Sequence, residues 1–148
     1  MTRHKSFVIV GAIVTLLAGV INGQSAVEVR AAASSAVSGW KQMSSPSGSP
    51  LWVAPTVQLT SADIERAEAR TDPGAGPSIA IILTDEGARK MSELAATQTN
   101  KPIALLLDGE VIWAPIMRGS IGKEVRLTGR DGGLTKTQID RLLASFKK

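Results

Sequence analysis

The sequence predicts an α+β fold in which a mostly antiparallel sheet carries helices on one face. Two apolar runs flank Asp108-Gly109, a dipeptide preferred in the turn of a tight antiparallel hairpin. Two other segments show the apolar spacing of one helical face, and short aliphatic runs lie between them. Helices mixed with such a hairpin are typical of a two-layer α+β sandwich.

The first part of the expected domain contains a strand, a helix and a second strand. Residues 52–59 have the composition of an extended segment. Thr60 with Asp63 three residues later forms a loose capping box, which predicts a helix that ends before the Pro- and Gly-rich residues 71–77. The aliphatic residues 78–83 then predict a strand.

The next helix is expected to begin after Thr84, whose hydroxyl is suited to an N-cap. Met91 and Leu94 follow Gly87 at spacings of four and seven residues, which places all three on one face. This helix is expected to run to about Gln98.

The remaining elements are three strands and a helix. The hairpin strands are expected at 103–107 and 110–113, and the alternation at 125–128 predicts a strand with one buried face. Thr135 and Gln138 form a second capping box before an amphipathic helix. The expected order is β-α-β-α-β-β-β-α.

The first 25 residues have the layout of a secretory signal peptide. Basic residues at 3–5 precede an apolar run at 7–21, and the following small residues fit cleavage between Ser25 and Ala26. The run is shorter than the roughly 20 residues that a membrane-spanning helix needs. We therefore expect export to the periplasm, with an uncleaved membrane anchor as the alternative.

Residues 26–50 are expected to form a flexible tether before the domain at 51–148. The Ser-, Pro- and Gly-rich residues 44–50 have the composition of a linker. Trp40 and Met43 are exceptions, because large apolar side chains are uncommon in a linker. They are expected either to dock on the domain or to mark a binding segment.

The composition excludes several kinds of site. The chain has no cysteine, and its one histidine, His4, would leave with a cleaved signal peptide. Removing Arg3 and Lys5 with that segment would lower the formal net charge from +4 to +2. No Lys/Arg cluster remains that would follow a nucleic-acid backbone. Without the usual general base and soft metal ligands, we expect no catalytic residue, metal site or cofactor.

A few charged residues still deserve a structural explanation. Asp85 and Glu86 fit the positive end of a helix dipole better than a catalytic pair, because adjacent helical residues do not face each other. Asp108 is explained by its turn. Arg118 and Lys123 flank a loop and form a candidate basic site for an anion, with a solvated loop as the alternative.

Four short motifs carry a resemblance to a known family. They are Leu-Thr-Asp-Glu-Gly-Ala at 83–88, Leu-Asp-Gly at 107–109, Ala-Pro at 114–115 and Leu-Thr-Gly at 127–129. In this order they resemble the head subdomain of the first periplasmic domain of SecD, an accessory subunit of bacterial protein export. The resemblance covers roughly residues 53–146.

The SecD resemblance implies a ferredoxin-like head that contacts translocating or unfolded polypeptide. It does not carry over the proton-driven motor, which belongs to the transmembrane helices of SecD. Trp113 stands where the family commonly has a small residue, so the surface chemistry of this strand is not inherited.

The hairpin register predicts a candidate interaction face. A two-residue turn pairs Leu107 with Glu110, and the expected pairs continue as Leu106–Val111, Leu105–Ile112 and Ala104–Trp113. One apolar face then carries Ile103, Leu105, Leu107 and Ile112, and the other carries Ala104, Leu106, Val111 and Trp113. Helices cover only one face of a two-layer fold. The second face needs the chain's own Trp40, Leu51 and Trp52, a second copy, or an extended polypeptide.

We therefore expect an exported, non-catalytic interaction module. Its expected partner is a protein or peptide of the cell envelope, with the Sec export machinery as one candidate and a homo-oligomer as another. Two alternatives stay open: an envelope enzyme that uses carboxylate and Ser/Thr residues, and a self-associating structural component.

The signal-peptide prediction can be tested by intact-mass measurement. Protein recovered from an envelope fraction is expected to begin at Ala26, because the small residues before it fit signal peptidase. A full-length mass in the membrane pellet would show instead that the segment is an anchor.

Overall fold

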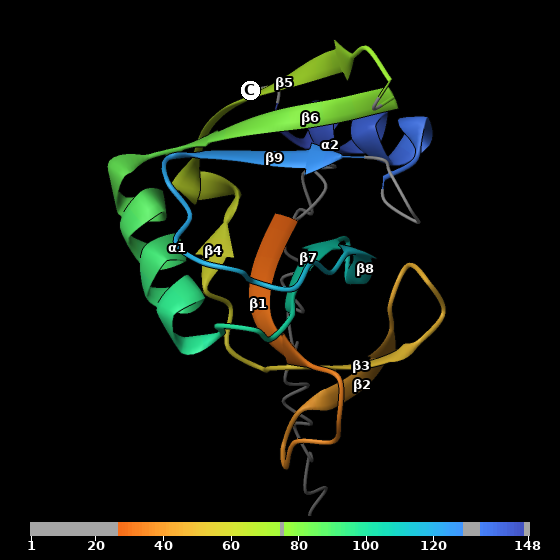
Figure 1. Ribbon diagram of the computed structural model, residues 1–148, viewed down its shortest axis with the longest axis vertical. Helices are drawn as coiled ribbons and strands as arrows, with labels where there is room; N and C mark the ends of the chain where they lie inside the picture. The colour runs from red at the N-terminus through yellow and green to blue at the C-terminus, as the bar shows by residue number, and fades with distance from the viewer. Residues whose placement is uncertain (1–26, 75, 129–133, 147–148) are drawn as a thin grey trace, which may run out of the picture.

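The computed structural model describes residues 27–74, 76–128 and 134–146, so the predicted cleavage between Ser25 and Ala26 lies outside the described residues. These residues form an α+β fold in which every strand pair is antiparallel and two α-helices accompany the strands (Figure 1). The coarse fold prediction is therefore confirmed. No described helix is both long and apolar enough to cross a membrane.

The larger sheet has the strand order β2-β3-β1-β7-β8, and the short β4 also pairs with β1. Its strands are β1 Val27–Ala33, β2 Lys41–Ser44, β3 Pro50–Val53, β4 Leu59–Thr60, β7 Ile103–Leu107 and β8 Glu110–Trp113. Strand β1 is central, because β7 pairs with one of its edges and β4 and β3 pair with the other.

The expectation of a flexible tether at 26–50 is wrong for the residues that the structure describes. Val27, Val29 and Ala31 are buried in the main core, and β1 pairs with β7 over five positions. The Ser- and Pro-rich stretch is only the loop of the β2–β3 hairpin, which extends from the body of the domain (Figure 1). The turn-forming composition therefore predicts the loop correctly, but it does not apply to the strands on either side of that loop.

The smaller sheet has the order β5-β6-β9, with β5 Ile64–Asp72, β6 Gly76–Leu83 and β9 Glu124–Thr128. The helix expected after Thr60 is wrong. The capping box is present, but it starts only a single 3₁₀ turn, η1 Ser61–Asp63. The chain then extends as β5, because pairing with the aliphatic β6 overrides the helix propensity of its Glu, Ala and Arg residues.

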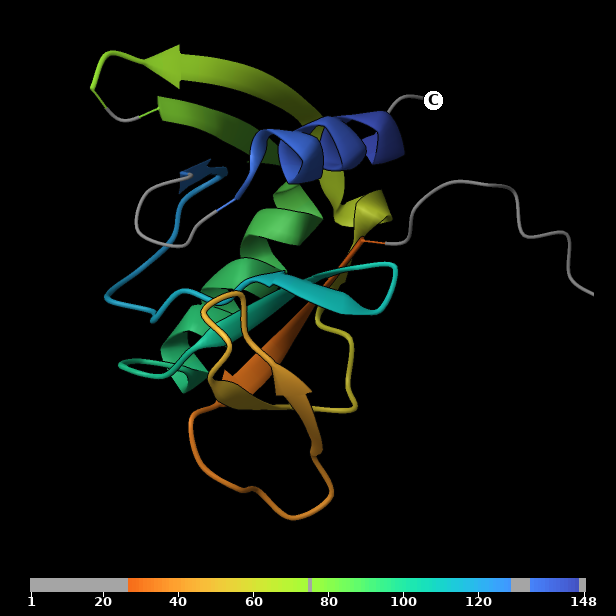
Figure 2. The same ribbon diagram turned by 90° about the vertical axis from the view of Figure 1, so that its right-hand side faces the viewer.

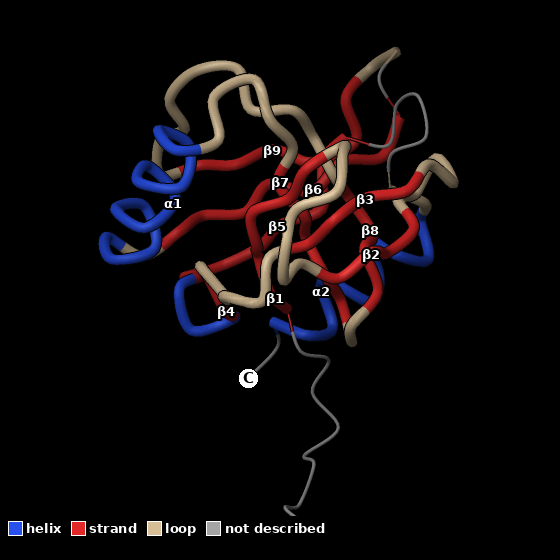
Figure 3. Tube along the Cα trace, turned by 90° about the horizontal axis from the view of Figure 1, so that it is seen from below, coloured by secondary structure: helices blue, strands red, loops and turns tan. Residues whose placement is uncertain are grey.

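The two sheets replace the single sheet of a ferredoxin-like sandwich, so that finer prediction is not confirmed. Helix α1 Asp85–Thr97 lies along one side of the strands, and α2 Lys136–Phe146 packs against the small sheet (Figures 1 and 3). Buried side chains of both sheets and both helices share one core. Members from distant elements include Val29, Ile81, Met91, Leu105 and Leu142.

Both helices begin at the caps that the sequence predicts. The Thr84 hydroxyl accepts a hydrogen bond from the Gly87 amide at 2.9 Å. The Thr135 amide donates to Gln138 Oε1 at 2.9 Å, and the Gln138 amide donates to Thr135 Oγ1 at 3.2 Å. These bonds satisfy amides that a helix start leaves without a partner.

The buried Asp63 joins the two sheets to the start of α1. Its carboxylate accepts hydrogen bonds from the Thr60 amide at 3.0 Å and from Lys90 Nζ at 3.0 Å. Its backbone carbonyl accepts from the Thr84 amide at 2.9 Å. The helix lies so close that a Cβ added at Gly87 would be 2.3 Å from the Asp63 carbonyl oxygen.

The hairpin turn is confirmed as type I′. Asp108 and Gly109 both have positive φ, at 51° and 79°. This is the backbone geometry that the right-handed twist of paired strands requires.

Gly109→Val is expected to destabilise the domain by about 1–2 kcal/mol, because a β-branched residue at positive φ is strained. Gly109→Asn is the control, since asparagine tolerates this conformation. Urea unfolding curves measure both free energies. A valine variant as stable as the asparagine variant would contradict the strain.

Gly87→Ala is expected to destabilise the domain by about 1–3 kcal/mol despite the higher helix propensity of alanine, because its Cβ would meet the Asp63 backbone. Gly122→Ala is the matched control, since nothing lies within 4 Å of a Cβ there. Thermal melts compare the two substitutions. Equal melting temperatures would show that the junction tolerates the added methyl group.

Candidate functional site

The predicted interaction face is divided by a β-bulge. Leu107 pairs with Glu110 and Leu106 with Val111, as the sequence predicts. The register then shifts, and Leu105 pairs with Trp113 instead of Ile112. The predicted pairs Leu105–Ile112 and Ala104–Trp113 are therefore wrong. A bulge sets two residues opposite one, so Ile112 and Trp113 both contact the main core.

The other three residues of that face are buried within the chain. Ala104, Leu106 and Val111 form a second, smaller core with Ala32 of β1 and the β3 residues Leu51 and Val53. Leu51 is one of the three covering residues that the sequence suggests, whereas Trp40 packs against the main core. The face as predicted is consequently not an exposed surface.

A concave groove of about 360 Å³ opens at the edge of this second core. Its apolar floor consists of the half-buried Met43 side chain and of Val53 and Leu106, whose side chains are mostly covered by the second core. Further lining residues are Glu28, Arg30, Gly39, Lys41, Pro55 and Gly109. Its lining residues within strands belong to β1, β2, β3 and β7 of the large sheet. The β2–β3 hairpin lies in front of this sheet in the view of Figure 2.

The pairing register of β1 with β7 places two charged residues of β1 along one wall of the groove. Glu28 stands opposite Leu106, and Arg30 stands opposite Ala104, so these charged residues share a face with the predicted interaction residues. The Arg30 guanidinium donates to Glu28 Oε2 at 2.6 Å and to the Pro55 carbonyl at 3.1 Å. These bonds fix the Arg30 side chain in place as a wall of the groove.

The charge of the rim comes from Lys41. Its side chain is exposed, and it lies at the edge of the same groove. Glu28 and Arg30 neutralise each other, so Lys41 gives the groove a cationic end. An apolar floor with a polar, partly charged rim is suited to a peptide segment rather than to a small polar substrate.

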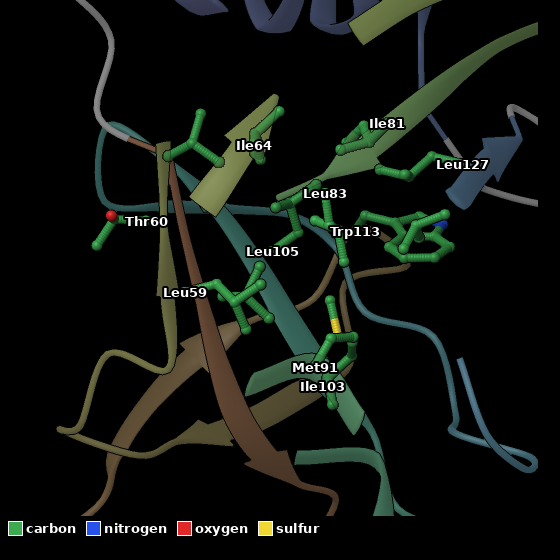
Figure 4. Close-up of a pocket in the computed structure, with 13 residues that line it drawn as sticks. Leu59, Thr60, Ile64, Ile81, Leu83, Met91, Ile103, Leu105, Trp113 and Leu127 are labelled. Atoms are coloured by element: carbon green, nitrogen blue, oxygen red, sulfur yellow. The ribbon is translucent and has the colours of Figure 1, made fainter. Parts of the chain in front are cut away.

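A separate apolar cavity of about 30 Å³ lies between the two sheets (Figure 4). Trp113, Met91 and Leu105 line it together with Ile81 and Leu127 of the small sheet. The Thr60 hydroxyl and the Trp113 indole N–H are the polar groups among its lining side chains. This cavity has no set of polar groups that would hold a cofactor, and it is explained as imperfect packing where the sheets meet.

The two residues of the candidate basic loop, Arg118 and Lys123, have different surroundings. Lys123 Nζ lies 3.0 Å from Asp85 Oδ1 and 3.7 Å from Glu65 Oε2. The hydrogen bond and charge of Asp85, followed by Glu65, raise the pKa of Lys123. Arg118 is exposed in the segment between β8 and β9. Lys123 is therefore paired with carboxylates in the structure. An anion site that uses both Arg118 and Lys123 stays a prediction.

The described residues contain no group of three or more His, Cys, Asp or Glu side chains that could hold a metal ion. Asp85 is engaged by Lys123, and Glu86 by Arg89. The hydrogen bond from Arg89 lowers the pKa of Glu86, which favours the charged form of this carboxyl group. These carboxylates stabilise the start of α1, where the helix dipole favours negative charge.

Comparison with known proteins places this fold in a family. The sequence profile described as "SecDF, P1 head subdomain" matches residues 21–144. The chain belongs to the SecDF P1 head family. The match includes the strands β1 and β2, which lie within the residues that the sequence predicts as a tether.

Relatives in this family are subunits of protein translocases. The chain is 38% identical over 63 residues to the protein translocase subunit SecDF of Thermus thermophilus, covering 43% of this chain and 9% of that protein. It is 33% identical over 88 residues to SecD of Acidaminococcus fermentans, covering 59% of this chain and 21% of that protein. The chain is thus related to the SecD head, and it spans a small part of the length of these relatives.

Solved structures show the same fold. A SecDF structure described as a membrane component that enhances protein export aligns with a TM-score of 0.60 at 23% identity, covering 82% of this chain and 63% of that chain. SecDF in its super-membrane-facing form aligns with a TM-score of 0.58 at 23% identity, covering 82% of this chain and 19% of that chain.

Proposed function

We propose that this P1 head domain acts without catalysis, by binding an extended segment of polypeptide during protein export. The groove lined by Met43, Val53 and Leu106 carries this proposal, because it combines an apolar floor with a charged rim. The family supports a role in export, since its members are translocase subunits. An exported, periplasmic location and a partner within the Sec machinery are parts of the same proposal.

The groove fits a sequence-tolerant binding mode. Its floor is formed by the apolar side chains of Met43, Val53 and Leu106. Methionine in particular is flexible and adapts to side chains of different shapes. Arg30 is held by Glu28 and by the Pro55 carbonyl, which leaves Lys41 as the cation that can approach a bound segment. We expect such a site to bind short apolar segments weakly and with little sequence preference.

The proposed groove can be tested by site-specific photo-crosslinking in cells. A photoreactive amino acid at Met43, in the lining of the groove, is expected to capture a secretory protein whose translocation has been stalled. The control position is Glu93, an exposed residue of α1 outside the groove. Adducts at both positions, or none at Met43 in cells where translocation is stalled, would contradict binding at this groove.

Lys41→Glu supplies a second measurement. It reverses the charge at the rim without changing the buried floor, so the domain is expected to keep its melting temperature and to lose adducts from a crosslinker placed at Met43. Unchanged adducts would show that the cation is not part of the site.

A further inference from the structure

Strand β5 forms an open edge of the small sheet. The described strands follow the order β5-β6-β9, so β6 pairs with only one side of β5 (Figure 1). The pairing is regular from Arg66↔Ile82 to Asp72↔Gly76, and its register shift lies between Ile64 and Arg66. Within the described part of the chain, a seven-residue segment of regular pairing centred on Ala69 therefore lacks a strand on its outer side.

Pro77 determines which backbone groups point to this open edge. It stands opposite Thr71 and has no amide hydrogen, so the two form a non-hydrogen-bonded pair of the ladder. The two kinds of pair alternate, so Ala69 also directs its N–H and C=O away from β6. The neighbouring Arg70 carbonyl faces β6, since it accepts a hydrogen bond from Ser78 Oγ at 3.3 Å.

The outer face of this segment carries charges of alternating sign. Arg66, Glu68 and Arg70 are all exposed, with Glu68 lying 3.4 Å from one arginine and 3.7 Å from the other. A two-fold axis at Ala69 would set Glu68 of each copy opposite the partner's Arg70. An axis at Glu68 would instead set like charges opposite each other. The charge pattern thus favours one antiparallel register with a second copy.

A groove of about 390 Å³ lies beside this edge and is lined by residues of β5 and α2. A second copy that pairs with β5 would also cover this groove. Arg66 on the outer face and Ala67 on the inner face both border it, so the groove follows the edge of the strand. The half-buried Leu143 and Phe146 lie on its α2 side, and an added strand would remove them from water.

We propose that two copies of this chain pair through their β5 strands, antiparallel about Ala69, and so join their small sheets into one. A foreign extended strand would also satisfy the backbone edge, but it need not carry the self-complementary charges. One pair of short strands is expected to bury less than the roughly 1,200 Å² of a stable interface, so the dimer is expected to be reversible. It is independent of the groove proposed for polypeptide.

Cysteine cross-linking tests the axis directly, because the chain has no cysteine of its own. Opposed residues of a hydrogen-bonded antiparallel pair have Cα atoms about 5.5 Å apart, which a disulfide can span. Oxidation of Ala69→Cys in cell envelopes is expected to give a dimer of this chain, whereas Ala96→Cys on the exposed side of α1 should not. Equal cross-linking at both positions, or capture of a different polypeptide by Ala69→Cys, would overturn the proposal.

Charge exchange tests the register. Glu68→Arg alone, and Arg66→Glu with Arg70→Glu, would each leave a single sign of charge at positions 66, 68 and 70. Both variants are expected to dimerise at least about tenfold more weakly than the wild type, and an equimolar mixture should recover the heterodimer. Sedimentation of protein recovered from the envelope measures the masses, and matched thermal melts verify folding. The proposed pairing would be contradicted if the wild type is a monomer at every concentration, or if the charge variants dimerise as strongly as the wild type.

Discussion

The large sheet depends on β1, because this one strand is paired on both of its edges. It joins β7 along five positions on one side, and β4 and β3 on the other. Its odd-numbered residues Val27, Val29 and Ala31 enter the main core, while Glu28 and Arg30 point to the opposite face and line the groove. The same two-residue alternation therefore supplies both the core that stabilises the sheet and the wall of the proposed binding site.

The small sheet is connected to this framework through a polar junction. Asp63 lies where β4 leads into β5, and Thr84 lies where β6 leads into α1. Their backbone hydrogen bond and the Lys90 ion pair bring these two chain segments together, and Gly87 allows the close approach. Since each sheet carries its own candidate contact surface, the junction also sets how those two surfaces are oriented relative to each other.

The sequence predicted those elements whose signals are local. Thr84, the Asp108-Gly109 turn and the Thr135–Gln138 capping box each act through neighbours within a few residues, and all three are present. The β5 strand was mistaken for a helix because Glu, Ala and Arg favour helices until a long-range partner such as β6 is available. Strand β1 was missed although Val27-Glu-Val-Arg30 alternates in the manner of a half-buried strand.

The candidate sites were harder to predict for the same reason. The bulge that moves Trp113 to the main core changes the count of residues on one strand, and the apolar pattern of β8 is compatible with either register. The concave groove needs residues from four separate strands, so no single segment of the sequence shows it. The open edge of β5 likewise became visible only once the strand order was known.

The cavity between the sheets has a mechanical consequence. Because its lining side chains come from both sheets, the dispersion contacts across this plane are incomplete. Unfolding eliminates internal void, so the unfolded chain occupies less volume and hydrostatic pressure shifts the equilibrium towards it. The contact between the two sheets is thus a place where pressure is expected to act on the domain.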